Sequence, residues 1–237
     1  MIQTVIKEIA FEPNLDQLLV ELRIKDKKKM AKEFLKFIEE AKNIARPKAI
    51  FNQMIIQQKG EDGVLIGSEN FKSRVLSKNL ENTDTVFPYV ATCGSALDDW
   101  SKGMTNILHS FWAESIKETA LTSAIIEVQN RLKSHYKANH ISIMTPGSLE
   151  DWPLTEQKKL FRLLGKSIET IGVVLTDNNY MLPVKTISCL AFPSDEAFFS
   201  CQLCPREDCP KRRAPFESNL MEEKYSQDKC DIAKTIN

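Results

Sequence analysis

The sequence lacks any long apolar run and any excess of one charge. No stretch of the 237 residues approaches the roughly 18 consecutive apolar residues of a transmembrane helix, so we expect no membrane span. Lysine plus arginine and aspartate plus glutamate number 32 each, so electrostatics give no reason to expect a nucleic-acid or anionic-membrane partner. The first residues lack the charged start and apolar stretch of a signal peptide, which predicts a cytoplasmic protein.

The apolar residues that are present follow both helical and strand periods. Hydrophobic residues make up 42% and charged residues 27%, as in ordinary soluble globular proteins. Helices are predicted at residues 27–45, 70–80, 108–136 and 155–164, and strands at residues 49–56, 64–66, 86–92, 140–144, 171–175 and 185–192. The mixture, with no internal repeat and no linker, predicts one α+β domain.

The longest predicted helix carries an apolar residue at every fourth position. These residues are Trp112, Ile116, Ala120, Ala124, Val128, Leu132 and Tyr136. A stripe of this kind favours a buried packing face over a cofactor site.

Two proline-bearing loops are the strongest functional signal. Thr145, Pro146, Gly147 and Ser148 follow one predicted strand, and a second loop runs from Met181 through Pro183 to the next. Loops at the ends of neighbouring elements can bracket an extended small molecule, because the scaffold holds them while their backbone groups stay free to bond it.

The residue order in these loops resembles the activation domain of cobalamin-dependent methionine synthase. In that family an Arg-Pro-Ala-Pro-Gly-Tyr loop opens the binding groove for S-adenosylmethionine (AdoMet), and a stretch similar to Leu-Thr-Glu…Met-Trp-Pro…Ser-Val-Ser closes the other side. Residues 145–147 resemble the first motif and residues 175–188 the second. The similarity extends over residues 6–192.

The resemblance implies an organisation and a set of contacts. Residues 1–198 would form one α+β domain with a mainly antiparallel sheet flanked by helices, and residues 199–237 a Cys-rich appendage with a polar tail. The implied AdoMet-binding residues are Thr145, Pro146, Gly147, Ser148, Met181 and Pro183.

The chain departs from the family pattern at two positions. Ile143 stands where the family has arginine, and Ser148 replaces its tyrosine. An arginine grips a carboxylate through charge-assisted hydrogen bonds that isoleucine cannot make. Lys185 and Arg162 are the candidates to take over that role.

The resemblance also implies a function. We expect a stand-alone reactivator of a corrinoid-dependent methyltransferase, such as a methionine synthase without its own activation domain, acting in methionine biosynthesis. It would bind AdoMet for the reductive methylation of cob(II)alamin, a form of vitamin B12, with the help of an electron donor. The Asp-x-His-x-x-Gly motif of cobalamin proteins is missing, which places the cobalamin on a partner protein. Methyl transfer from a sulfonium to cobalt needs no general acid or base, so no catalytic residue is expected.

Two further local features have alternative interpretations. Glu150 and Asp151, beside Trp152, either face the ligand or cap the helix that follows, with Trp152 as a core anchor. Cys93 is either an activated thiolate at a helix N-terminus or, as we favour, a small buried residue.

The appendage contains Cys201, Cys204 and Cys209, a C-x2-C-x4-C pattern. It predicts a metal site: a [4Fe–4S] cluster, which we favour, or zinc, each of which usually takes four protein ligands. The fourth ligand would be Cys189, Cys230 or a non-protein group. Beyond about residue 218 we expect a partly disordered polar tail.

Two alternatives to the reactivator remain. The first is a non-catalytic docking or iron–sulfur electron-transfer subunit that has lost AdoMet binding, which the isoleucine at position 143 favours. The second is an iron–sulfur or zinc protein with no corrinoid connection.

Overall fold

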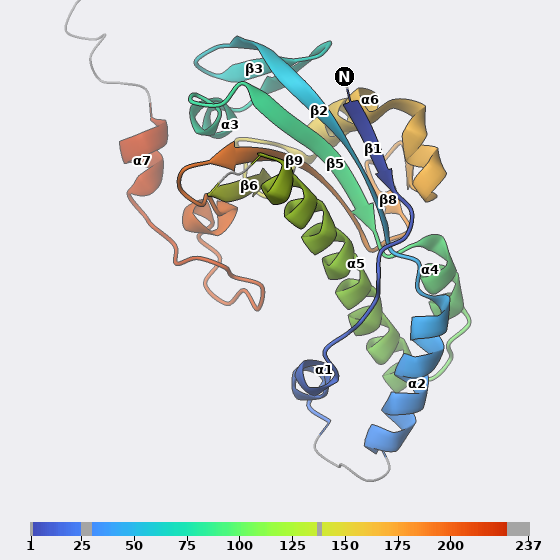
Figure 1. The fold of residues 1–237 in the computed structure, drawn as a ribbon. Coiled ribbons are helices and arrows are strands. Elements are labelled where there is room, and N and C mark those ends of the chain that lie inside the picture. Colours follow the sequence, from blue (N-terminus) through green and yellow to red (C-terminus); the bar gives the residue numbers. More distant parts are fainter. Residues whose placement is uncertain (1, 25–29, 137–138, 227–237) are drawn as a thin grey trace, which may run out of the picture.

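The computed structural model describes residues 2–24, 30–136 and 139–226, and its centre is a mainly antiparallel sheet (Figure 1). The strand order is β4-β3-β2-β5-β9-β6, with β1 paired to β2. The strands are β1 (Ile2–Ile6), β2 (Lys48–Lys59), β3 (Gly63–Ile66), β4 (Glu69–Lys72), β5 (Thr85–Thr92), β6 (His140–Met144) and β9 (Thr186–Ser194). A separate hairpin pairs β7 (Val174–Leu175) with β8 (Met181–Leu182).

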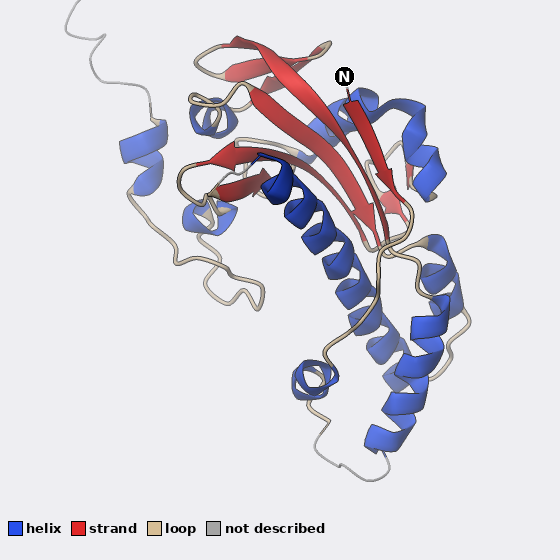
Figure 2. Cartoon of the chain, in the orientation of Figure 1, coloured by secondary structure: helices blue, strands red, loops and turns tan. Residues whose placement is uncertain are grey.

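One face of the sheet is covered by the long helix α5 (Ile107–Tyr136), which continues past the sheet to α2 (Met30–Ile44) and α4 (Ser95–Lys102), with α1 (Leu15–Glu21) nearby (Figures 1 and 2). The predicted α5 stripe from Trp112 to Leu132 is buried, which confirms the packing face. This side holds the larger apolar core.

The opposite face is covered by shorter elements. They are α3 (Arg74–Asn79), α6 (Gln157–Leu164) and α7 (Leu220–Tyr225), with 3-10 helices at Leu154–Glu156, Gly165–Ile171 and Ser200–Leu203. Two smaller apolar clusters lie on this side. None of the helices in the described ranges combines the length and apolarity that crossing a membrane requires.

The expected α+β class and antiparallel sheet are confirmed, whereas some element boundaries were wrong. Residues 69–72 form β4, because Gly67 adopts a left-handed φ of 59° that turns the chain back onto β3. The helix therefore begins only at Arg74, where the side chain of Ser73 caps it. Of the strand expected at residues 171–175 only Val174–Leu175 forms, because Gly172 ends a 3-10 helix just before it.

Part of the stretch beyond residue 218, where we expected partial disorder, is ordered. Helix α7 packs its Tyr225, only 1% exposed, against Phe198, and the Tyr225 hydroxyl donates to Asn79 Oδ1 at 3.0 Å. An apolar ring on one side of a short helix is enough to dock it. Cys230 lies outside the described residues.

Candidate functional site

Residues 145–148, the Pro-Gly loop, follow directly after β6 and are fixed by their own hydrogen bonds. The Gly147 N–H donates to the Trp152 carbonyl at 2.7 Å, and the Ser148 hydroxyl donates to the Thr145 carbonyl at 2.7 Å. The Thr145 Oγ1 lies 3.2 Å from the sulfur of Cys189 on β9. The loop is thus held against β9 before any ligand binds.

Glycine is required at position 147 because of its backbone conformation. Its φ is 83°, in the left-handed region that side chains disfavour, and a Cβ there would approach the Leu154 Cβ to 3.2 Å. Gly147 and Ser148 are exposed, whereas Pro146 is buried and can only shape the loop.

Of the acidic pair after this loop, Asp151 is engaged by another helix. Asp151 accepts the Ser73 hydroxyl and the N–H groups of Arg74 and Val75, both at 3.1 Å, so it caps α3 and not the helix that follows it. Trp152 is fully buried, which confirms it as a core anchor, while Glu150 is exposed. Asp151 therefore ties the Pro-Gly loop region to the start of α3.

The second loop, residues 181–185, is anchored at its far end. It contains a cis peptide bond before Pro183. The Thr186 hydroxyl donates to the Pro183 carbonyl at 2.7 Å, and the Cys93 N–H donates to the Lys185 carbonyl at 3.0 Å. Pro183 is buried and Met181 half-buried, so Met181 is the member of this pair that a ligand can reach.

Between the two loops the edge of β9 is open. Strand β6 pairs with β9 only from Leu190 to Ser194, so no strand in the described part of the chain covers residues 186–189 on that side. Backbone groups on a free strand edge can bond an extended ligand. We take this open β9 edge, with the two loops, as the candidate site.

A cavity of about 830 Å³ lies elsewhere, between α3 and the C-terminal residues. It is lined by Asn79, Phe198 and Tyr225 among others, and it includes no residue of either loop. We do not take this cavity as the candidate site, because its lining mixes acidic and basic side chains that do not converge on one ligand group.

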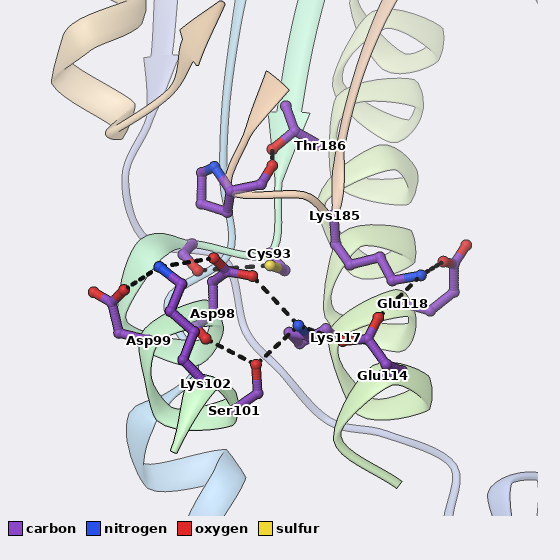
Figure 3. A network of polar contacts seen from close by, with 12 residues as sticks. Cys93, Asp98, Asp99, Ser101, Lys102, Glu114, Lys117, Glu118, Lys185 and Thr186 are labelled. Carbon is purple, nitrogen blue, oxygen red and sulfur yellow. Dashed lines mark hydrogen bonds and ion pairs between the residues drawn. The ribbon is translucent and has the colours of Figure 1, made fainter. Parts of the chain in front are cut away.

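A chain of charges borders the open β9 edge on the α5 side (Figure 3). Lys185 Nζ lies 3.1 Å from Glu118 and 3.5 Å from Glu114, and Lys211 also contacts Glu118. Burial acts to raise the pKa of Glu118, but hydrogen bonds from the two lysines prevail and lower it. Glu118 thus stays ionised between two ammonium groups.

Sequence reasoning missed a buried lysine in the same network. Lys117 is only 4% exposed, and its Nζ lies 3.3 Å from Asp98, 2.9 Å from the Ser101 hydroxyl and 2.5 Å from Glu114 (Figure 3). The available signal was its position, directly after Ile116 on the stripe helix. A charge so placed needs partners, because an unpaired buried charge is costly.

The two cysteines near the site are unreactive by environment. Burial, aided by Asp98, raises the pKa of Cys93 to about 12. Burial likewise raises the pKa of Cys189 to about 11. Cys93 is therefore the small buried residue that we favoured, and not an activated thiolate.

Residues 199–214, the Cys-rich segment, fold around an arginine. The Arg212 guanidinium donates to the carbonyls of Cys201 at 2.9 Å, Cys204 at 3.1 Å and Ala214 at 3.2 Å, and also to that of Arg206. Within the described residues, no three histidine, cysteine or acidic side chains are arranged to hold a metal ion. This conformation does not fit a metal centre, and the metal site stays a prediction.

The pKa of Cys201 in this segment is lowered. Burial acts to raise its pKa, but backbone N–H groups of Arg213 and Ala214 and the charge of Arg213 prevail and lower it. The Arg213 N–H lies 3.5 Å from the sulfur. At a given pH a larger share of Cys201 is therefore thiolate than for a thiol of ordinary pKa.

Sequence comparison finds no matching protein-family model and no matching curated protein. Structural comparison defines the fold as that of a methionine synthase reactivation domain, in agreement with the sequence resemblance. One matching structure is the crystal structure of the MetH reactivation domain bound to AdoHcy, with a TM-score of 0.57 and 13% identity. The match covers 84% of this chain and 80% of that one, so almost the whole architecture is shared.

Proposed function

We propose that this chain binds AdoMet along the open β9 edge and reactivates a corrinoid-dependent methyltransferase. The observation that carries the proposal is the likeness, over 84% of the chain, to a reactivation domain bound to AdoHcy. The placement of the Pro-Gly loop and of residues 181–185 at the two ends of one unpaired strand edge supports it. Methionine synthase is the expected system.

The role of the chain is to bind and orient. When bound, AdoMet supplies an activated methyl group, and a corrinoid on a partner protein supplies the cobalt that accepts it. Exposed Gly147 and Ser148, half-buried Thr145 and Met181 would contact the ligand, while buried Pro146 and Pro183 hold the loops in shape. An electron donor remains a required partner of this proposal.

Calorimetric titration tests the binding step directly. AdoMet and AdoHcy are titrated into anaerobically purified protein, alone and with cobalamin present. Micromolar binding, corresponding to about 8 kcal/mol, is expected for both ligands. Absence of heat in all four titrations would contradict the proposal and favour the alternative below.

The alternative is a docking or electron-transfer subunit without AdoMet. It is favoured by Ile143, which is buried under α5 and offers no polar group at the position where the family has arginine. This reading needs the cluster predicted at Cys201, Cys204 and Cys209. Visible absorbance and metal content, measured on anaerobically purified wild type and on Cys204→Ser, test whether the cluster is present.

The expected signature of a cluster is a brown protein that Cys204→Ser bleaches and Cys93→Ala does not. Cys93 is a matched control because it is a buried thiol outside the segment. A colourless wild type containing zinc would end the redox role, and a metal-free wild type would agree with the conformation described above.

A further inference from the structure

Arg213 belongs to the Cys-rich segment, which touches the Pro-Gly loop. Its Cζ lies 5.4 Å from the centroid of the Phe199 ring, a cation–π arrangement that orients it. The next residue after Phe199, Ser200, has its hydroxyl 3.4 Å from that of Ser148 in the loop. The Cys-rich segment therefore meets the candidate site at the point where Arg213 is held.

The charge of Arg213 also acts on two buried groups of the sheet. It opposes burial, which raises the pKa of Cys189 on β9 and of its β5 neighbour Tyr89. Cys189 is also the residue whose sulfur meets Thr145 Oγ1. The Pro-Gly loop thus touches the Cys-rich segment through Ser148 and, through Thr145, a residue on which the charge of Arg213 acts.

The other basic side chains in reach are already engaged. Lys185 pairs with Glu118 (Figure 3), Lys211 pairs with the same carboxylate, and Arg212 donates to carbonyls of its own segment. Arg162, the other candidate from the sequence, forms a two-point pair with Glu69 at 2.8 and 2.6 Å. Neither sequence candidate is free to bind a ligand carboxylate.

Arg213 differs from all of them. Its side chain is exposed, and it forms no ion pair with any carboxylate of the described residues. Its side-chain contacts are the Phe199 ring and the Cys201 sulfur, whose pKa it helps to lower. An oriented guanidinium that is not paired with a carboxylate of the described residues is suited to bidentate binding of a ligand carboxylate.

We propose that Arg213 binds the carboxylate of the ligand at the open β9 edge and so replaces, from another segment, the arginine that is missing at Ile143. The inference rests on the proposed function, because it assigns one contact of the AdoMet site. It gives the Cys-rich segment a role that needs no metal: the segment completes the site. It also explains how a chain with isoleucine at this position can retain a carboxylate partner.

Two ligands and three variants test this assignment. AdoMet and decarboxylated AdoMet, which lacks only the carboxylate, are titrated into wild type, Arg213→Ala, Arg213→Lys and Arg206→Ala. Arg206 is the matched control, an exposed arginine of the same segment. Arg213→Ala should weaken AdoMet about 10-fold and leave decarboxylated AdoMet unchanged. Arg213→Lys should lose less, because it keeps the charge but not the fork.

The outcomes distinguish a failure of the Arg213 assignment from a failure of the proposed AdoMet binding. If wild type binds AdoMet and Arg213→Ala binds it as well as Arg206→Ala does, the assignment of Arg213 is overturned and AdoMet binding stands. An equal loss for both ligands also overturns it, since the change would then act on the site as a whole. If wild type binds neither ligand, the proposed function itself fails. Thermal melts of each variant confirm that the protein is folded.

Discussion

Two segments border the same strand edge and are held by different forces. The Pro-Gly loop is fixed by backbone hydrogen bonds and by its connection to fully buried Trp152. The Cys-rich segment is held by Arg212 at its centre and by Lys211, whose side chain is 69% exposed, at its rim. The difference indicates that the first is a rigid part of the scaffold, while the second responds to charge and salt.

The same contrast recurs within one helix. On α5, Glu114 pairs with the buried Lys117, and Glu118 pairs with the exposed Lys211. Two chemically similar ion pairs, one turn apart, therefore sit in very different surroundings. Burial decides how much each is worth.

The largest expected effect is that of Lys117→Ala. It leaves the buried carboxylate of Asp98 with only the exposed Lys102, 3.4 Å away, so the free energy of unfolding should fall by about 3 kcal/mol. Denaturant unfolding measures the change. Lys133→Ala, an exposed lysine on the same helix, serves as control and should alter stability by about 0.5 kcal/mol or less. Equal effects would show that the network is solvated.

Gly147→Ala should come next. A side chain at a φ of 83° costs about 1–2 kcal/mol, and relief of the contact with Leu154 would displace the loop. We expect a protein that remains folded but binds AdoMet at least about 10-fold more weakly, as measured by titration. Gly103→Ala is the control, because no atom lies near a Cβ there and its φ is −82°. Unchanged affinity in Gly147→Ala would remove the Pro-Gly loop from the site.

The rigid parts of the molecule could be predicted from the sequence, whereas the charged contacts could not. A stripe such as Trp112 to Leu132, or glycine after proline at position 147, has a local cause that a pattern can reveal. The pairing of Lys185 with Glu118, or Asp151 capping α3, joins residues far apart in the chain and depends on the tertiary fold. For the same reason the cysteine spacing predicted a metal, while the fold revealed Arg212 at the centre of the segment.

Arg212→Ala tests how the Cys-rich segment is held. It removes donors to several carbonyls, each worth about 0.5–1.5 kcal/mol, in a partly exposed loop. Amide hydrogen exchange of residues 199–214 should become roughly 10-fold faster, while exchange in β5 and β9 stays unchanged. Arg206→Ala should leave exchange in the segment as in wild type. Slow exchange in Arg212→Ala would show that something else, such as a bound metal, organises the segment.

The smallest expected effect is that of Lys211→Ala. An exposed pair contributes about 0.2–1 kcal/mol, and Glu118 keeps Lys185 as a partner. The free energy of unfolding should therefore fall much less in Lys211→Ala than in Lys117→Ala.

The contribution of Glu118 depends on pH. Because the pKa of Glu118 is lowered in the folded state, its contribution to stability is present above the unfolded pKa and is lost as pH falls through the folded pKa. Denaturation at neutral and acidic pH, and at low and about 1 M salt, measures it. If the difference in free energy of unfolding between wild type and Lys211→Ala persists at acidic pH and high salt, Lys211 acts by packing and not by charge. The contrast with Lys117 would then lie in burial alone.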